Sequence, residues 1–401
     1  MKVGIFTDQF YPYISGVVTS IKMLYEGLTD LGHEVYVFSS IDEEKVASCE
    51  ELKNFNFVNL PGKPYPFKDL KDYRYIKKPK KLIPILKPYQ LDIIHVHTEF
   101  NIAKIARVIG KTLNIPIVHT LHTLYEDYLR YVSPFFDKHF HNIMFKTLAK
   151  MFVRKISRAS TIEIVPTRKV LSLSKRYYME GDIRVIPTGI ELDCFSPAKF
   201  TQEEKDSLKE KLGIPKDKFV FGYIGRTSAE KGIDMIIRAF SRLKNHNNSI
   251  LFIVGGGPQL ESLKNLAEYH NVLDSVLFTG FIENDHIPIY YQICDIFVNA
   301  SKSETQGLTY IESLASALPL LVQKDDCIED VIEDYYNGIY FDGEEDLVTK
   351  MEEIQKVPST LKNIKANTMK SCLKFSKEHY AKSVEALYKD AITIYNNKRK
   401  K

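Results

Sequence analysis

The chain has 401 residues, more than one ordinary hydrophobic core organises, and this length predicts two domains. With 44% hydrophobic and 26% charged residues, the composition is typical of a globular protein, and no run approaches the roughly 18 apolar residues of a membrane-spanning helix. Five scattered cysteines without a Cys-x-x-Cys pair argue against structural zinc and favour reduced thiols in a cytosolic protein.

The net charge of +4 is distributed unevenly along the chain. Residues 1–195 carry 28 Lys and Arg against 21 Asp and Glu, a balance of +7, and the remainder carries 27 against 30, a balance of −3. A basic first half predicts an acidic partner, which is a membrane surface, a nucleic acid or another polyanion. The apolar start of the chain is interrupted by Asp8 and is too short for a signal peptide.

Short apolar runs alternate with helical patterns along the chain, which predicts parallel sheets covered by helices. The expected strands are residues 3–7, 34–38, 93–96, 117–120 and 163–166, and then residues 219–224, 250–254, 276–279, 296–299 and 319–322. Because the set occurs twice, we expect an α/β fold with two Rossmann-like domains, residues 1–195 and 196–374. The spacing of apolar residues over 372–395 predicts one long C-terminal helix.

Ligands of parallel α/β sheets bind beyond the carboxyl ends of the strands, so residues that follow strands are the first candidates for a site. After the first strand, a loop runs to Gly16, which either lets a ligand approach the backbone or makes an ordinary turn. Four histidines, at positions 95, 97, 119 and 122, lie at the ends of neighbouring expected strands and favour a polar site. Their spacing does not suggest a metal site, and a single histidine is more often structural.

Two segments of the second half carry groups suited to phosphate. Arg226 and Lys231 follow the strand at 219–224, and their cations can neutralise a diphosphate, although basic residues beside a helix start are common. The glycine run at residues 255–257 follows the next strand, where it either cradles phosphate or packs closely against backbone near the ligand.

Glu304 and Glu312 flank the start of a helix. We expect Glu304 at the end of the strand at 296–299 and Glu312 about two turns into the following helix, with unpaired N–H groups between them. Carboxylates accept hydrogen bonds from hydroxyls, and a helix start attracts phosphate. The pair therefore predicts a ligand that carries both groups, such as a nucleotide-sugar.

Two basic segments of the first half indicate what kind of partner the protein binds. Residues 63–87 hold nine Lys and Arg and four prolines, which predicts a loop with a short helix. Residues 138–160 contain no acidic residue, and their cations recur every fourth position beside an apolar stripe. This pattern is typical of a helix that binds a membrane surface, or of one whose apolar face packs on the domain core. The candidate membrane-binding residues are Lys146, Lys150, Phe152, Arg154, Lys155 and Arg158.

Taken in order, these segments resemble the retaining GT-B glycosyltransferases of family 4 over nearly the whole chain. The resemblance is carried by the Gly16 loop, by residues 225–226, 230–232, 254–258 and 278–280, and by Glu304-x7-Glu312 with Gln306-Gly307-Leu308. It implies two Rossmann-like domains that face a central cleft, with a C-terminal helix, about residues 375–401, that crosses back to the first domain.

The resemblance also implies roles for the matching residues. Arg226 and Lys231 would bind the donor diphosphate and stabilise the leaving phosphate, while Glu312 would bind the ribose and Glu304 the transferred hexose. His122 would lie near the primary hydroxyl of the sugar, and it completes the expected catalytic set of His122, Glu304, Arg226 and Lys231. The other implied donor contacts are Gly16, Gly256, Gln306, Gly307 and Leu308.

No Asp-x-Asp motif follows an expected strand, and cationic side chains can replace a metal at a diphosphate. We therefore expect no metal and no cofactor beyond the nucleotide-sugar. Retention by front-face attack, in which the leaving phosphate helps to deprotonate the acceptor, is what the resemblance implies.

A closer resemblance, to bacterial diacylglycerol glucosyltransferases, is carried by residues 14–20, 97–100, 120–123, 131–134 and 304–310. It implies transfer of glucose from UDP-glucose to the 3-hydroxyl of 1,2-diacylglycerol by a peripheral enzyme on the cytoplasmic face of the cell membrane, with anionic lipids as partners. A family 4 enzyme with another lipid or soluble glycan acceptor, and a nucleotide-sugar epimerase of the same fold, remain alternatives. A nucleic acid is not expected, because the basic segments contain no recognised nucleic-acid motif.

Overall fold

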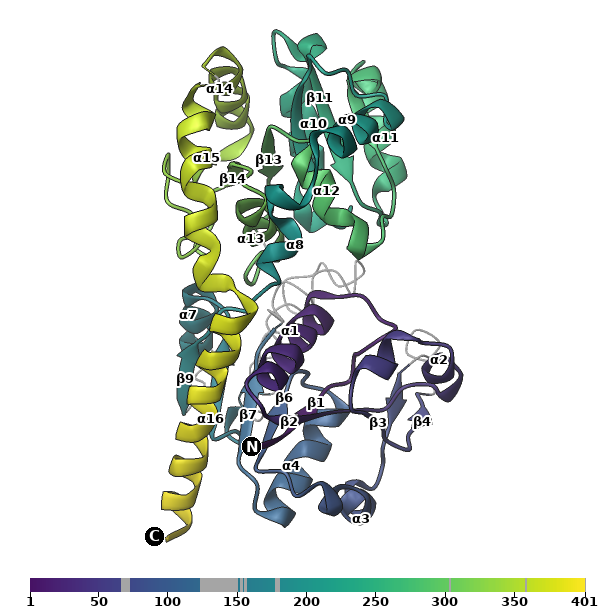
Figure 1. Cartoon of the computed structure of the whole chain (residues 1–401), viewed down its shortest axis with the longest axis vertical. Coiled ribbons are helices and arrows are strands. Elements are labelled where there is room, and N and C mark those ends of the chain that lie inside the picture. The colour runs from purple at the N-terminus through teal and green to yellow at the C-terminus, as the bar shows by residue number, and fades with distance from the viewer. Residues whose placement is uncertain are drawn as a thin grey trace, which may run out of the picture. The chain divides into compact units, whose positions relative to one another are not determined.

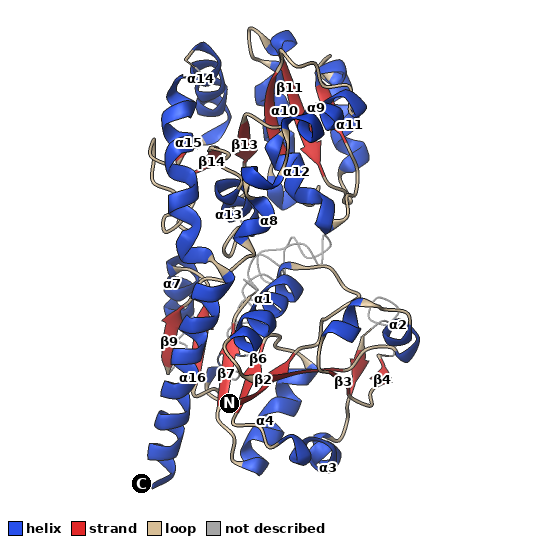
Figure 2. Cartoon of the chain, viewed as in Figure 1, coloured by secondary structure: helices blue, strands red, loops and turns tan. Residues whose placement is uncertain are grey.

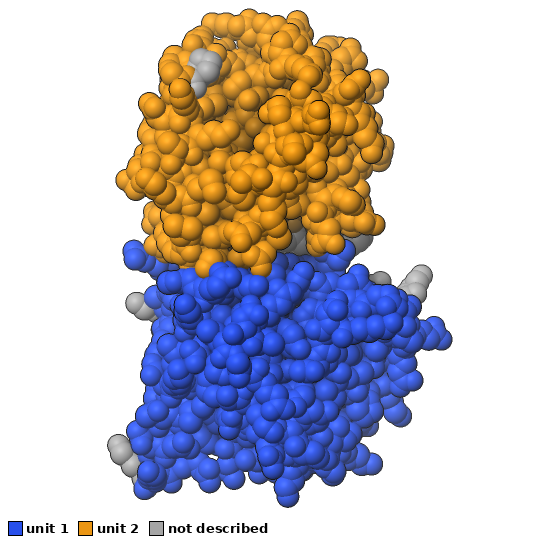
Figure 3. Space-filling model, in the orientation of Figure 1, with its two compact units in different colours: residues 1–189, 377–401 blue, residues 190–376 orange. Residues whose placement is uncertain are grey.

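The computed structural model describes residues 1–65, 73–122, 151, 154, 157–176, 181–302, 304–357 and 359–400. The chain forms two compact units, residues 1–189 with 377–401 and residues 190–376 (Figure 3). The division precedes the short helix α8 (Leu192–Phe195), because α8 packs on other helices of the second unit.

The first unit is built on a parallel seven-stranded sheet in the order β3-β2-β1-β6-β7-β8-β9 (Figure 2). Its strands are β1 (Lys2–Phe6), β2 (Glu34–Ser39), β3 (Phe57–Asn59), β6 (Ile93–Val96), β7 (Ile117–Thr120), β8 (Ile162–Val165) and β9 (Asp182–Val185). The five strands expected in this half are all present, and β3 and β9 are added at the two edges. The basic segment contains a separate antiparallel pair, β4 (Lys63–Pro64) and β5 (Arg74–Tyr75).

Helices cover the sheet of the first unit, and their buried faces form its core with the strands. They are α1 (Gly16–Asp30), α2 (Glu43–Ala47), α3 (Ile83–Leu86), α4 (Asn101–Leu113), α7 (Arg168–Arg176) and α16 (Lys377–Lys400). Ser15 caps α1 by accepting a hydrogen bond from the Val18 backbone N–H. This cap explains why the helix begins directly after the loop that follows β1.

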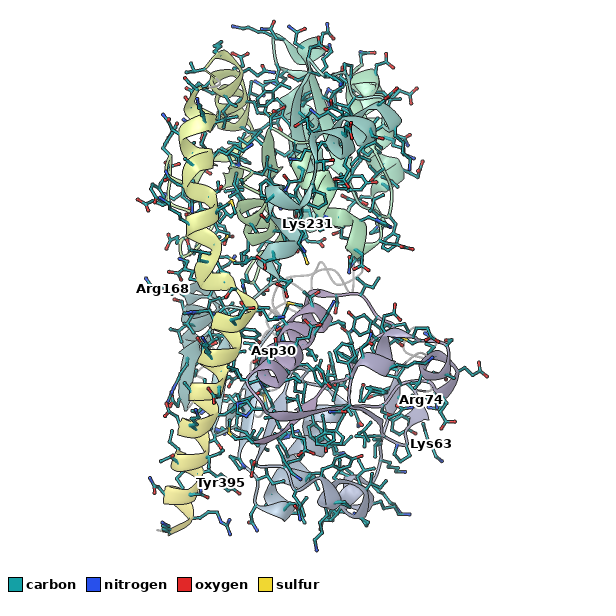
Figure 4. The ribbon with its side chains drawn as sticks, in the orientation of Figure 1. Asp30, Lys63, Arg74, Arg168, Lys231 and Tyr395 are labelled. Atoms are coloured by element: carbon teal, nitrogen blue, oxygen red, sulfur yellow. The ribbon has the colours of Figure 1, made fainter. Side chains whose placement is uncertain are left out.

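The C-terminal helix α16 packs against α1 within the first unit (Figure 1). The two helices come close because residue 27 is a glycine: a Cβ on Gly27 would lie 2.6 Å from the Cβ of Ala381. Lys377 forms an ion pair with Asp30 at 3.5 Å beside this contact, and His33, whose pKa is lowered by burial, lies 3.3 Å from Glu385 (Asp30 is labelled in Figure 4). The last helix therefore belongs to the first unit although the second unit precedes it in sequence.

One expectation for the C-terminus was wrong. Instead of a single helix over residues 372–395, α15 ends at Cys372, a 3-10 turn follows at Leu373–Phe375, and α16 begins at Lys377. Ser376 between them is extended and forms a β-bridge with Ile190. The helical pattern is interrupted because this bridge needs extended backbone.

The second unit repeats the arrangement with a parallel six-stranded sheet in the order β12-β11-β10-β13-β14-β15. Its strands are β10 (Phe219–Ile224), β11 (Ser249–Val254), β12 (Val276–Phe278), β13 (Ile296–Asn299), β14 (Leu320–Gln323) and β15 (Gly338–Phe341). Its helices are α8, α9 (Gln202–Lys211), α10 (Ile233–Ser241), α11 (Leu260–Tyr269), α12 (Ile287–Gln292), α13 (Leu308–Ala315), α14 (Gly343–Lys356) and α15 (Ser359–Cys372).

Both faces of this second sheet carry a buried apolar cluster. The expected class, an α/β fold with two doubly wound parallel sheets, is therefore confirmed. Across the described part of the chain, every helix is too short or too polar to span a membrane.

Candidate functional site

The carboxyl ends of β10 and β13 bring two of the predicted site residues together. The strands are direct neighbours in the sheet, with Phe221 opposite Ile296. The loop after β10 can approach the end of β13 closely because residue 232 is a glycine with φ +65°, where a Cβ would lie 2.8 Å from the Ala300 carbonyl oxygen. As a result, Lys231 Nζ lies 2.5 Å from Glu304 Oε1, and both side chains are largely buried (Lys231 is labelled in Figure 4).

The turn after Glu304 determines where the next helix starts. Gly307 adopts φ +70°, and a Cβ there would lie 2.3 Å from the ring of Tyr310, so glycine is required at this position. The helix α13 consequently begins at Leu308. Glu312 is therefore only about one turn into the helix, and the expectation of two turns was wrong.

Glu312 is held in place by a buried tyrosine. The Tyr291 hydroxyl donates a hydrogen bond to Glu312 Oε2 at 2.7 Å, and the Tyr291 side chain is fully buried. Burial raises the pKa of Glu312, and the Tyr291 hydrogen bond offsets part of this rise. Among the described residues, no hydrogen bond is formed by the other carboxylate oxygen, Oε1, which can accept from a hydroxyl. No sequence signal pointed to Tyr291, which lies 21 residues before its partner.

Arg226 lies in the loop directly after β10, and its side chain is exposed. The backbone of this loop is fixed by Tyr223, whose hydroxyl donates to the Arg226 carbonyl oxygen at 2.9 Å. In the described part of the chain, no salt bridge engages the Arg226 guanidinium. Its five N–H donors can therefore be offered to an anion.

The glycine run beside this loop is explained largely by backbone packing. A Cβ on Gly255 would lie 2.0 Å from the Gly225 carbonyl oxygen, and one on Gly257 would lie 2.4 Å from the Thr227 carbonyl oxygen. A Cβ on Gly256 would meet a different neighbour, the Phe281 backbone nitrogen, at 3.2 Å. The run therefore holds the strand-end loops together, and a donor contact of Gly256 stays a prediction.

This end of the second sheet combines groups of opposite charge in a small region. Lys231 and Arg226 follow β10, Glu304 follows β13, and the first N–H groups of α13 lie between Glu304 and Glu312. Cations and helix N–H groups bind phosphate, and carboxylates bind hydroxyls. The arrangement suits a ligand that carries both.

In the first unit, Gly16 is exposed at the first position of α1. A Cβ there would meet no described atom within 4 Å, so nothing in the described fold requires glycine. We expect Gly16→Ala to leave the free energy of unfolding unchanged or raise it by up to about 1 kcal/mol. If a nucleotide-sugar approaches this backbone, we expect donor affinity to fall by about tenfold, which corresponds to about 1.4 kcal/mol.

Denaturant unfolding and equilibrium donor binding measure these two effects separately. Gly32→Ala is the matched control, because Gly32 also lacks neighbours within 4 Å but has φ +81°. That variant should lose stability through backbone strain and keep its donor affinity. Unchanged donor affinity in Gly16→Ala would refute the predicted role of Gly16.

The four histidines singled out in the sequence lie at the ends of the adjacent strands β6 and β7 and take part in three separate hydrogen-bonded groups. His97 Nδ1 lies 3.0 Å from His122 Nε2, and burial lowers the pKa of both rings, that of His122 to about 3. The buried His95 bonds Thr120 and Tyr388, each at 2.7 Å. His97, His122 and His95 are therefore neutral near pH 7.

His119 has a different environment. Its Nδ1–H donates to Glu163 Oε1 at 3.0 Å, because the two residues are opposite each other on β7 and β8. Burial lowers the pKa of His119, but the hydrogen bond to Glu163 and the charges of Glu163 and Glu99 outweigh it, so the pKa is raised. This cluster places His119 between two buried carboxylates, Glu163 on β8 at 3.0 Å and Glu99 beyond the end of β6 at 3.7 Å. A glutamate within the apolar run at 162–165 was the signal that could have identified it.

The candidate membrane-binding segment lies mainly outside the described residues, including Lys146, Lys150, Phe152 and Lys155. Of its other members, Arg158 is exposed and Arg154 is half-buried. The second basic segment is described except for residues 66–72; besides the β4–β5 pair it forms 3-10 turns at Pro79–Leu82 and Lys87–Tyr89 around α3. Its lysines 77, 78, 80, 81 and 87 are all exposed.

Comparison with known proteins gives matches along the whole chain. The family model described as Glycosyltransferase Family 4 matches residues 14–193, and the one described as glycosyl transferases group 1 matches residues 204–371. Two relatives are called alpha-monoglucosyldiacylglycerol synthase. The protein from Acholeplasma laidlawii is 38% identical over 100% of both chains, and that from Streptococcus pneumoniae is 36% identical over 100% of this chain and 88% of its own.

Solved structures resemble the chain in fold. Anabaena HepE, determined in complex with UDP, has a TM-score of 0.78 at 16% identity and covers 97% of this chain and 100% of its own. Sucrose-phosphate synthase from Thermosynechococcus elongatus has a TM-score of 0.75 at 19% identity and covers 98% of this chain and 99% of its own. The two-domain arrangement of parallel sheets is thus shared over almost the entire length of the chain.

Proposed function

Because the chain belongs to glycosyltransferase family 4 and has the GT-B fold, we propose that it transfers glucose from UDP-glucose to the 3-hydroxyl of 1,2-diacylglycerol. The product would be α-monoglucosyldiacylglycerol, made at the membrane surface. The observation that carries the proposal is the 38% and 36% sequence identity, over the whole of this chain, to two relatives named for the synthesis of this lipid.

The donor half of the proposal rests on the geometry of the second unit. Arg226 and Lys231 bind the diphosphate, Glu304 binds the hexose, and Glu312 binds the ribose hydroxyls. The ion pair between Lys231 and Glu304 supports this division, because a hexose-1-diphosphate joins a hydroxyl-bearing ring directly to a phosphate. The backbone at Gln306, Gly307 and Leu308 lies at the helix start, where N–H groups favour an anion.

In the proposed reaction the bond between the anomeric carbon and the diphosphate oxygen breaks, and a bond from that carbon to the acceptor oxygen forms on the same face. The acceptor proton passes to the leaving phosphate. Lys231 and Arg226 stabilise the charge that develops there, so we propose that no metal is needed. His122 binds the hexose, and its low pKa keeps it neutral during the reaction.

The acceptor half of the proposal rests on the basic first half of the chain. We propose that the enzyme works as a peripheral protein at the cytoplasmic face of the membrane, held by anionic lipids. Replacing Lys146, Lys150 and Arg158 by Gln is expected to weaken binding to anionic liposomes by about a hundredfold, since each surface cation contributes about 1 kcal/mol. Cosedimentation over a series of anionic-lipid fractions measures this change.

The control replaces three exposed lysines of the second unit, Lys199, Lys211 and Lys244, by Gln, which removes the same charge elsewhere. If both triple variants lose liposome binding equally, the segment has no special role. If the native protein binds neither anionic liposomes nor the lipid substrate, the membrane part of the proposal fails.

A panel of nucleotide-sugars tested against diacylglycerol liposomes and soluble glycans examines the reaction itself. We expect a glucolipid from UDP-glucose and no product with soluble glycans. Transfer only to a soluble acceptor would favour a different family 4 activity, and isomerised sugar without transfer would favour an epimerase.

A further inference from the structure

The neutral histidine pair at the ends of β6 and β7 shares a single hydrogen. His97 Nδ1 and His122 Nε2 are 3.0 Å apart, and a hydrogen bond between two neutral rings needs one nitrogen with a proton and one without. The His97 ring is also 4.1 Å from that of His95, centroid to centroid, and its backbone N–H donates to the Phe6 carbonyl. His97 is thus held by ring packing on His95 and by its backbone hydrogen bond to Phe6, whereas His122 is half-buried in the loop after β7.

The other ring nitrogen of His97 indicates which ring carries the shared hydrogen. His97 Nε2 is buried and has no hydrogen-bond partner in the described fold. If His122 donated, His97 would have to carry its own hydrogen on Nε2, which would leave a buried N–H without an acceptor. Such groups are rare in folded proteins. If His97 donates from Nδ1, the unpartnered Nε2 holds only a lone pair.

The structure assigns to His97 the role of a positioning residue for His122. By donating from Nδ1, His97 occupies Nε2 of His122 and forces the His122 hydrogen onto Nδ1. His122 then meets its ligand as an N–H donor, through Nδ1, and is not available as a general base. This assignment rests on the proposed function only in identifying that ligand as an oxygen of the transferred hexose.

The test uses the full chain labelled with [15N]histidine, because the ring nitrogen signals report which nitrogen carries hydrogen. His97→Leu and His97→Asn form a matched pair of similar size, and the Asn side-chain amide lies near the position of the lost Nδ1. His286→Leu is the control, because His286 is an exposed histidine of the second unit. His122→Gln identifies the His122 signals by their loss, and kcat and KM are measured for all proteins.

We expect native His122 to carry hydrogen on Nδ1. In His97→Leu its two tautomers should mix and kcat should fall by about tenfold, the value of one hydrogen bond, with a smaller change in KM for diacylglycerol. His97→Asn should restore the Nδ1–H tautomer and most of kcat, and His286→Leu should match the native protein. If His97→Leu does not fold, the native tautomer and the His97→Asn variant still decide the assignment.

Hydrogen on Nε2 of native His122 would overturn the assignment. So would a His97→Leu variant that keeps the native tautomer, or one that changes tautomer and keeps its kcat. A native protein with the expected tautomer that transfers no sugar from any donor would support the hydrogen-bond assignment and refute the proposed function, which separates the two.

Discussion

The Lys231→Met variant is expected to lose about two to three orders of magnitude in kcat, the usual effect of removing one group that stabilises charge in a transition state. Met has nearly the length of Lys and no charge, so the substitution removes the cation and keeps most of the side-chain volume. The partner of Lys231, Glu304 at 2.5 Å, then remains without its cation beside the leaving diphosphate. Both effects oppose departure of the phosphate.

Single-turnover kinetics with saturating donor measure the chemical step for this variant. Lys264→Met is the matched control, since Lys264 also pairs with a glutamate, Glu261 at 2.8 Å, but on the surface of α11. That variant should have native kcat. The kcat of Lys231→Arg should lie between those of Lys231→Met and Lys264→Met, because Arg keeps the charge but presents it as a planar fork. Native kcat in Lys231→Met would remove Lys231 from the catalytic set.

Glu312→Gln is expected to raise the dissociation constant of the donor by about 10- to 100-fold with a smaller effect on kcat. Hydrogen bonds to a charged group contribute about 1.5–3 kcal/mol, and Gln keeps the shape of the side chain without the charge. A ribose contact lies away from the reacting bond, so the loss should appear in binding. Calorimetry with UDP and with UDP-glucose should therefore report equal losses.

The Tyr291→Phe variant tests the role of the Glu312 carboxylate by changing its pKa. Burial raises the pKa of Glu312, and the Tyr291 hydroxyl offsets part of that rise, so removal of the hydroxyl raises the pKa further. The carboxylate form binds ribose hydroxyls, and it is lost as pH falls through the pKa. The acid-side decrease of donor affinity should therefore begin at a higher pH in Tyr291→Phe than in the native protein. An unchanged or lower onset would show that Glu312 does not bind the donor as a carboxylate.

Strands in the centre of each sheet could be predicted from the sequence, whereas outer strands mostly could not. Central strands such as β10 and β13 are buried on both faces and are therefore continuous apolar runs. In the two parallel sheets, the missed strands β3, β9 and β15 are all at an edge, and the short pair β4 and β5 outside these sheets was missed as well. In β9 every residue is only half-buried, and Asp182 and Arg184 interrupt the apolar pattern.

The candidate site was predicted residue by residue but not as an arrangement. Each strand end was visible in the sequence, but the contact between Lys231 and Glu304 depends on β10 and β13 being neighbours, and strand order has no local signal. Partners separated by long stretches of chain were missed for the same reason. Tyr388 reaches His95 from 293 residues away, because α16 returns to the first unit.

The proposed reaction can be observed by incubating the protein with diacylglycerol liposomes and UDP-glucose labelled with 13C at the anomeric carbon. NMR of the extracted lipid identifies the acceptor, the sugar and the anomeric configuration in one measurement. We expect a single labelled glucosyldiacylglycerol in the α configuration. A β-linked lipid, or labelled free or isomerised sugar without any glycolipid, would contradict the proposed reaction.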